Sequence, residues 1–180
     1  MQLQNEKIQI TLKAQGAEMT SWKVSGTELL WQGDPTYWGR QAPILFPIVG
    51  RLLDDQYVYE GNTYTMSQHG FARDAMFEIE SSTATSVRFT LNDTSESRQH
   101  YPFPFTLSVS YQLVGEEVIV TYRVHNPGET TLPFSIVRRL KRVIHYMWRT
   151  KKINPTSCRI DFWFRSDRLV RLHILTLAFS

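Results

Sequence analysis

The most regular pattern of hydrophobic and polar positions lies between residues 103 and 124. Apolar or aromatic side chains occupy every second position up to residue 113, and again from residue 118 to residue 124, on either side of Gly115-Glu116-Glu117. A period of two that is interrupted by a short polar turn is typical of two antiparallel strands sharing one buried face. The pattern therefore predicts a long hairpin with one face turned toward the core.

Shorter alternating runs fill the rest of the first 136 residues. They predict strands at residues 7–14, 18–24, 28–31, 77–79, 87–91 and 132–136, a hairpin at residues 56–66 and a polar loop at residues 92–100. No segment before residue 137 has the 3.6-residue period of an amphipathic helix. Strands joined by turns, without helices between them, predict an all-β fold, and specifically an antiparallel β-sandwich.

The pattern changes at residue 137. Residues 1–137 hold 9 Lys and Arg against 15 Asp and Glu, a net charge of −6, whereas residues 138–180 hold 11 against 2, a net charge of +9. Strand alternation ends at the same place. We therefore divide the chain into a β-sandwich domain, residues 1–136, and a basic tail, residues 137–180, which is expected to be irregular or partly helical. A helix at residues 143–150 is one interpretation of the tail.

Length and cysteine content restrict the class of protein. A chain of 180 residues is long enough for one domain with a real core. Cys158 is the only cysteine, so no disulfide forms within the chain. There is no secretory signal and no apolar run near 18 residues. We therefore expect a cytoplasmic protein with no membrane partner.

Candidate chemistry is concentrated around two short segments. An apolar run, residues 44–49, ends at Gly50-Arg51, and His69-Gly70-Phe71-Ala72-Arg73 follows a predicted hairpin. Arg51, His69 and Arg73 all donate hydrogen bonds and suit a polyhydroxylated or anionic small molecule. The alternative is that both arginines are solvated and His69 belongs to a turn. Trp38 is a candidate for stacking on a sugar ring, or for packing at the edge of the sandwich.

Several motifs resemble the aldose 1-epimerase, or galactose mutarotase, family, and in particular its small bacterial branch. They are GAEMTSWKVSGTELLWQGDPTYWGRQAPILFPIVGRL, YEGNTYTMSQHGFARD, YPFPFTLSVSYQL and LPFSI, in that order, between residues 16 and 136. The resemblance implies a galactose mutarotase-like supersandwich, of which this chain holds the N-terminal portion.

The resemblance also implies a reaction. A general base and a general acid open the ring of an aldohexose, with or without a phosphate group, and the ring closes to the other anomer. No cofactor or metal is implied. Arg51 and His69 are similar to the family's sugar-contacting residues, and Arg73 is similar to an arginine of the branch related to hexose-6-phosphate epimerases. The family's catalytic His and Glu match no position here, and His145 and His173 fit no motif. No catalytic residue is therefore identified.

The tail departs from the family at one point. In the family, PFSI is followed by Gly-Gly-His-Pro-Ala-Phe or Gly-Ala-His-Pro-Ala-Phe, whereas here Val137-Arg138-Arg139-Leu140 follows Ile136. The codons CCG GCG TTT AAA encode Pro-Ala-Phe-Lys, and the same bases read one position later encode Arg-Arg-Leu. The interpretation that we favour is a shifted reading frame from Val137. A divergent tail and a basic arm for a partner are the alternatives.

Three functions are then compared. The first is a carbohydrate isomerase of the aldose 1-epimerase type that lacks its catalytic pair and is expected to be impaired. The second is a non-catalytic sugar-binding β-sandwich that uses Arg51, His69, Arg73 and Trp38. The third is nucleic-acid binding through the basic, aromatic tail. No known nucleic-acid motif accompanies that tail, so no nucleic-acid partner is expected. The sequence leaves the choice of sugar and the oligomeric state open.

Overall fold

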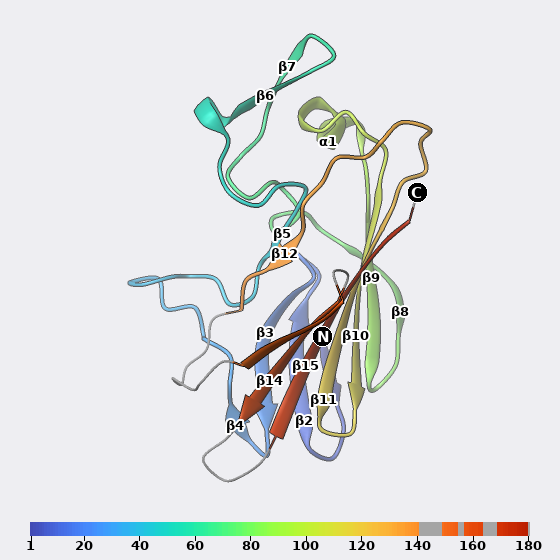
Figure 1. Cartoon of the computed structure of the whole chain (residues 1–180). Coiled ribbons are helices and arrows are strands. Elements are labelled where there is room, and N and C mark those ends of the chain that lie inside the picture. Colours follow the sequence, from blue (N-terminus) through green and yellow to red (C-terminus); the bar gives the residue numbers. More distant parts are fainter. Residues whose placement is uncertain (141–148, 155–156, 164–168, 180) are drawn as a thin grey trace.

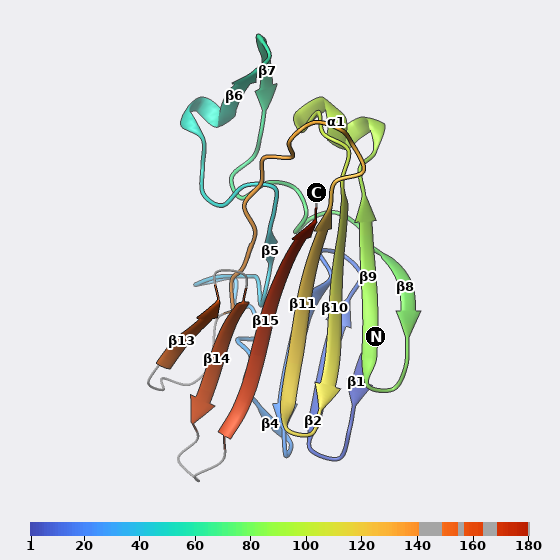
Figure 2. The same cartoon turned by 45° about the vertical axis from the view of Figure 1, so that its right-hand side comes forward.

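The two larger β-sheets of the described residues pack face to face, with loops gathered at one end (Figures 1 and 2). The structure is a computed structural model that describes residues 1–140 and the backbone of residues 149–154, 157–163 and 169–179. The smaller sheet has the order β1-β2-β3-β4 and the larger the order β13-β14-β15-β11-β10-β9-β8. The strands of the smaller sheet are β1 (Gln2–Gln4), β2 (Ile8–Lys13), β3 (Glu18–Val24) and β4 (Thr27–Glu28).

The larger sheet is built on the predicted hairpin. Strand β10 (Thr106–Val114) pairs with β11 (Glu117–His125), and Val109 lies opposite Tyr122. Strand β10 also pairs with β9 (Ser86–Asn92), which pairs with β8 (Glu78–Ser82). All these pairs are antiparallel. The predicted all-β sandwich and the predicted hairpin are confirmed.

The core lies between the two sheets. Every second residue of β2, β10 and β11 is buried, which follows directly from the alternation in the sequence. The phenol of Tyr111 crosses the core and donates a hydrogen bond of 2.7 Å to the carbonyl oxygen of Ala17, just before β3. Burial raises the pKa of Tyr111, so this donor keeps its proton. This buried polar contact joins the two sheets within a mostly apolar core.

Three short elements differ from the predictions. Residues 95–100 were expected in a polar loop, but they form helix α1 (Ser95–His100), because Thr94 and Ser97 make reciprocal capping hydrogen bonds. The predicted strand at residues 132–136 is not a strand, and pairing begins only at β12 (Val137–Arg138). Of the predicted strand at residues 28–31, only Glu28 is in a strand, β4.

The tail also differs from the prediction. Residues 149–154, 157–163 and 169–179 form strands β13 (Arg149–Asn154), β14 (Ser157–Trp163) and β15 (Leu169–Phe179), so irregular or partly helical structure was wrong for them. Strand β15 pairs in parallel with β11. The physical reason is that an edge strand offers unpaired backbone N–H and C=O groups, which a neighbouring segment satisfies without any side-chain alternation. Of the helix considered at 143–150, the first six residues lie outside the described residues, and Arg149 and Thr150 begin β13.

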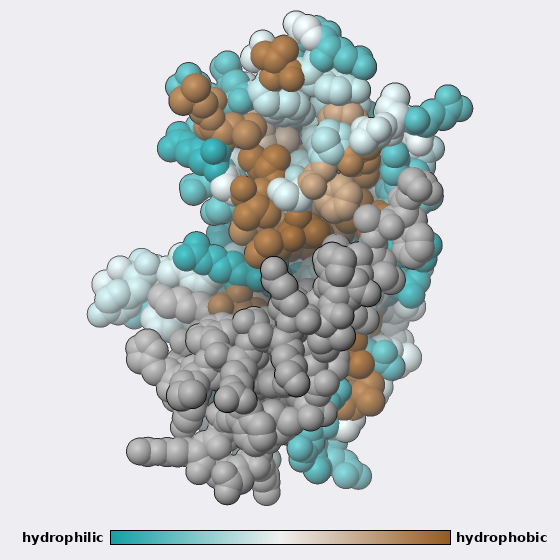
Figure 3. Space-filling view, viewed as in Figure 1, coloured by the Kyte–Doolittle hydropathy of each residue, from teal (hydrophilic) through white to brown (hydrophobic). Residues whose placement is uncertain are grey.

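Two segments form the open end of the sandwich. Strand β5 (Ile44–Leu45) pairs with β12, and a hairpin of β6 (Gln56–Tyr59) and β7 (Asn62–Thr65) follows a short 3-10 helix, Leu53–Asp55. This hairpin confirms the one predicted at residues 56–66. Figure 3 shows apolar surface gathered in the region where Figure 1 places β5 and β12. Val137, in β12, is 47% exposed, and Val49, which follows β5 in the chain, is 43% exposed.

A close backbone approach connects this end to the turn before Arg73. The peptide bond between Phe46 and Pro47 is cis. The carbonyl oxygen of Phe46 accepts hydrogen bonds from the N–H groups of Phe71 and Ala72, at 3.1 and 3.2 Å. Gly70 lies against this carbonyl in the left-handed region, with φ of +70°, and a Cβ atom there would be 2.2 Å from the oxygen. Only glycine fits this contact.

Within the part of the chain that the structure describes, no helix is long and apolar enough to cross a membrane. Helix α1, with 6 residues, is the one α-helix of those residues.

We predict that Tyr111→Phe lowers the free energy of unfolding by about 1 kcal/mol, because it removes the buried hydrogen bond to Ala17 while keeping the ring. Urea denaturation measures the change. The matched control is Tyr37→Phe at a side chain that is 76% exposed, where a change within about 0.5 kcal/mol is expected. Equal effects of the two substitutions would show that the inter-sheet hydrogen bond contributes nothing.

Gly70→Ala is expected to destabilise the chain by about 1–3 kcal/mol more than Gly61→Ala does. Both glycines have positive φ, +70° and +78°, but nothing lies within 4 Å of a Cβ added at Gly61. The comparison therefore separates the collision with Phe46 from ordinary left-handed strain. Thermal or urea unfolding of both variants provides the measurement, and similar losses would contradict the close approach.

Candidate functional site

Two hydrogen bonds with the backbone of Gly50 fix His69, one to its backbone and one to its ring. Its own N–H donates to the carbonyl oxygen of Gly50 at 2.8 Å, and the N–H of Gly50 donates to the ring atom Nδ1 at 3.0 Å. A backbone N–H only donates, so Nδ1 must be the unprotonated nitrogen. The imidazole is therefore neutral with its proton on Nε2. The local backbone is bent to allow this, since His69 has φ of +70°.

The charges around His69 favour the same state. Partial burial, the positive charge of Arg73 and that of Arg139 lower the pKa of His69 below its ordinary value. Near neutral pH, the ring therefore presents a neutral N–H donor rather than a cation.

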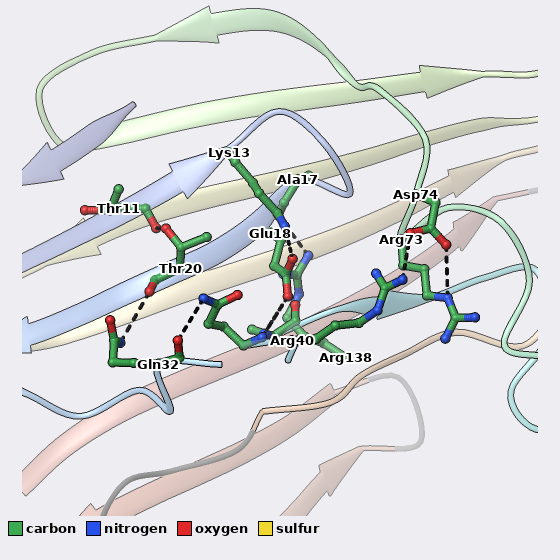
Figure 4. Close-up of polar contacts among 12 residues, drawn as sticks. Thr11, Lys13, Ala17, Glu18, Thr20, Gln32, Arg40, Arg73, Asp74 and Arg138 are labelled. Atoms are coloured by element: carbon green, nitrogen blue, oxygen red, sulfur yellow. Dashed lines mark hydrogen bonds and ion pairs between the residues drawn. The ribbon is translucent and has the colours of Figure 1, made fainter. Parts of the chain in front are cut away.

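Arg73 shares a carboxylate with another arginine (Figure 4). Its Nε lies 3.3 Å from Oδ2 of Asp74, and Nη2 of Arg40 lies 2.8 Å from Oδ1 of the same group. The Nε atom of Arg73 is buried, and its contact with Asp74 lacks the geometry of a hydrogen bond. Two guanidinium groups thus share one acidic partner, which leaves one positive charge of this trio uncompensated.

Arg51 is turned toward its own loop. Nε and Nη2 of Arg51 contact the carboxylate of Asp55 at 2.8 and 2.6 Å, and the arginine side chain is 66% exposed. The backbone N–H of its neighbour Gly50 donates to Nδ1 of His69, so Arg51 is joined to His69 through the backbone. Arg73 is one of the two cations whose charge lowers the pKa of His69.

Trp38 lies beside Arg139. The guanidinium carbon of Arg139 is 5.3 Å from the centre of the Trp38 ring, so a cation covers one face of this indole. The carbonyl oxygen of Trp38 accepts a hydrogen bond of 2.7 Å from Nε1 of Trp31, which anchors the loop. Sugar stacking on Trp38 stays a prediction, and it concerns the other face of the ring.

Arg138 and Arg139 are the residues that sequence reasoning missed. Arg138 is 8% exposed and donates to the hydroxyl of Tyr122 and to the carbonyl oxygens of Ala42 and Ala17, the last two at 2.8 and 3.1 Å. In the structure, residues 132, 134, 136 and 138 alternate inward and the residues between them alternate outward. An arginine is rarely found at an inward position, so the sequence pattern does not predict that Arg138 is buried.

A separate hollow includes Asp74 in its lining. Its volume is about 420 Å³, and it is lined by Phe71, Asp74, Ala75, Met76, Leu91, Asn92, Thr94, Glu96, Ser97 and His100. Arg51, His69 and Arg73 do not line it. Within the described residues, no three His, Cys, Asp or Glu side chains gather as they would around a metal ion.

Known proteins resemble this chain over most of its length. A sequence profile of the aldose 1-epimerase family matches residues 1–137. The plasmid and chromosomal LacX proteins of Lactococcus lactis are each 37% identical over 143 residues, which are 76% of this chain and 48% of theirs. The chain thus spans about half the length of the curated relatives that it matches.

Solved structures agree with this assignment. A galactose mutarotase related enzyme from Lactobacillus acidophilus is 34% identical, with a TM-score of 0.75 over 93% of this chain and 51% of its own. A galactose mutarotase-like protein from Lactobacillus casei is 28% identical, with a TM-score of 0.79 over 97% of this chain and 67% of its own. The sandwich, its core hairpin and the matched sequence together show that this chain belongs to the aldose 1-epimerase family.

Proposed function

We propose that this chain is an aldose 1-epimerase-type protein that binds an aldohexose beside His69 and Arg73 and interconverts its anomers weakly or not at all. The observation that supports binding is the pairing of a neutral Nε2–H donor, fixed by Gly50, with an adjacent arginine. Sugar hydroxyls accept hydrogen bonds from both groups. We also propose a cytoplasmic location, on the basis of the single cysteine.

Arg51 and Trp38 complete the proposed site. Arg51 reaches a ligand only after its side chain turns away from Asp55, and the exposed pair costs little to break. Trp38 supplies an indole ring, one face of which lies against Arg139. Both residues are therefore assigned to the rim, and His69 and Arg73 to the centre.

We infer weak catalysis because the proposed site lacks the family's general acid and general base. Ring opening requires one group to remove the proton of the C1 hydroxyl and another to protonate the ring oxygen. Where the family motif places Gly-Gly-His-Pro-Ala-Phe after PFSI, this chain has Val137-Arg138-Arg139-Leu140. An arginine does not exchange its proton near neutral pH, so Arg139 replaces an acid–base group with a permanent cation.

The family profile ends at residue 137, next to the boundary where charge and pattern change. This supports the proposal that the reading frame shifts at Val137. The contacts of β12 and Arg138 show that the first residues after the boundary nevertheless pack into the sandwich. The second candidate function, a non-catalytic sugar-binding sandwich, is favoured by the same replacement at residues 137–140.

We predict little mutarotase activity in the 180-residue chain. Polarimetry of freshly dissolved α-galactose and α-glucose measures the rate, and the comparison protein is the same gene with the frame restored after Ile136. Acid–base assistance is worth about 10²–10⁴-fold, and that is the expected difference between the two proteins. Full activity of the 180-residue chain would show that the residues after Ile136 are a working replacement.

Sugar binding is expected to weaken about tenfold in His69→Ala and in Arg73→Ala, because each loses a hydrogen-bond donor. Titration calorimetry with galactose and glucose tests this. Arg98→Ala is the control, since Arg98 pairs with Asp93 beside α1. If the control weakens binding as much as the two site variants do, the site is wrongly placed.

The tautomer of His69 gives a third test by ¹⁵N NMR. The ring is expected to carry its proton on Nε2 and to titrate below the ordinary value of about 6.5. Because the folded-state pKa is lowered, the stability that it contributes is complete above about pH 6.5 and is lost as the pH falls through the folded-state value. Arg73→Ala should raise the pKa of His69, whereas Arg51→Ala should not. Equal shifts in both variants would contradict the geometry.

A further inference from the structure

The segment that joins β11 to β12 runs along the open end of the sandwich (Figures 1 and 2). It contains the LPFSI motif, residues 132–136, to which the proposed function gives no role. The hydroxyl of Tyr101 donates to the carbonyl oxygen of Pro133 at 2.9 Å, and the centres of the Phe134 and Phe46 rings are 5.9 Å apart. Tyr101 and Phe46 both belong to the buried core. The motif is therefore held at a fixed position against that core.

Ser135 of this motif contacts the chain on both sides of Ile48. Its backbone N–H donates to the carbonyl oxygen of Pro47 at 2.8 Å, and its Oγ accepts a hydrogen bond of 2.9 Å from the N–H of Val49. Val49 lies outside the strands, so its N–H depends on this hydroxyl rather than on strand pairing. One residue thus holds the two peptide groups on either side of Ile48, immediately before Gly50.

Gly50 needs this support because its own surroundings are open. It has φ of +112°, and nothing lies within 4 Å of a Cβ atom added to it. The next residue, Arg51, has an exposed side chain that contacts only its own loop, through Asp55. Glycine also has more backbone freedom than any other residue. Without an anchor before it, Gly50 would not keep its N–H directed at Nδ1 of His69, 3.0 Å away.

The other side of that contact is closed by hydrogen bonds of its own. The N–H of Gly70 donates to the carbonyl oxygen of Ser67 at 2.9 Å, and the hydroxyl of Ser67 donates to the carbonyl oxygen of Gly70 at 3.1 Å. These two bonds fix the turn that carries His69. Loss of the Ser135 contact should therefore move Gly50 and leave the backbone of His69 in place.

We propose that Ser135 is a positioning residue for the proposed sugar site: its hydroxyl fixes Gly50, and Gly50 in turn keeps the imidazole proton of His69 on Nε2, where it is donated to the sugar. This rests on the proposed function, which assigns the sugar as the ligand of His69. Supporting hydrogen bonds of this kind hold a binding side chain in its productive orientation. The role belongs to the part of the chain that matches the family profile, so it does not depend on the residues after position 137.

The experiment measures the ¹⁵N shifts of the His69 ring in the 180-residue chain. In Ser135→Ala the N–H of Val49 loses its acceptor, so the two neutral tautomers should mix. The titration midpoint of His69 should rise by about 0.5 pH unit, because a hydrogen bond to the neutral ring is weakened. The charges of Arg73 and Arg139, which also lower the pKa of His69, are the same in this variant. Ser135→Thr keeps the hydroxyl and should restore the spectrum of the intact chain, whereas an unchanged tautomer and midpoint in Ser135→Ala would overturn the proposal.

Tyr111→Phe is the control for a merely structural effect. It removes the buried hydrogen bond to Ala17 between the two sheets, so it lowers stability without touching Ser135 or Gly50. The tautomer and the midpoint of His69 should stay as they are in the intact chain. If this variant shifts them as much as Ser135→Ala does, the effect is a general loosening of the core and the proposal is overturned.

Titration calorimetry with galactose separates this proposal from the proposed function. Ser135→Ala is expected to weaken galactose binding about threefold, and Ser135→Thr to restore it. If the intact chain and Ser135→Ala bind galactose equally well, the positioning role is overturned and the proposed function stands. If the intact chain binds no galactose, the proposed function fails, whereas the tautomer comparison still decides whether Ser135 fixes the ring of His69.

Discussion

The burial of one guanidinium group, that of Arg138, sets the geometry of the open end of the sandwich. A charge taken out of water must be surrounded by acceptors, and here they come from the approach to β3, the approach to β5 and strand β11. Such a group adds little net stability compared with an apolar side chain. Its consequence is geometric, because the segments that supply the acceptors are brought to fixed distances from one another.

A second close contact links the β5 segment to the proposed site. The carbonyl of Phe46 follows directly from the β5 segment and receives the N–H groups of Phe71 and Ala72, with Gly70 packed against it. His69 is thereby held against Gly50, and its ring is fixed as a neutral donor. The site thus depends on backbone positions that tolerate little change, and its charged side chains are arranged around them.

The relation to the aldose 1-epimerase family is one of shared fold over about half the length of the curated relatives. In this chain, strands of the basic tail complete the larger sheet through backbone pairing, and β15 lies along β11. Backbone hydrogen bonds satisfy a sheet edge regardless of side-chain type. General acid–base chemistry is different, because it requires particular side chains at particular positions. A segment of any sequence therefore pairs with a sheet edge more readily than it supplies a general acid and a general base.

The sequence alone determined the sandwich, the central hairpin and the pairing of the β6 and β7 segments, because burial of one face of a strand requires a period of two. Through the resemblance to the family, it also predicted a sugar site at Arg51, His69 and Arg73, and this stays a prediction. It did not find α1, which depends on the capping contacts of Thr94 rather than on an apolar stripe. It placed Arg51 with the other two, whereas a carboxylate four residues away holds its side chain. The tertiary structure alone decided the inward position of Arg138, because a charged residue is acceptable in a core only when acceptors from distant segments converge on it.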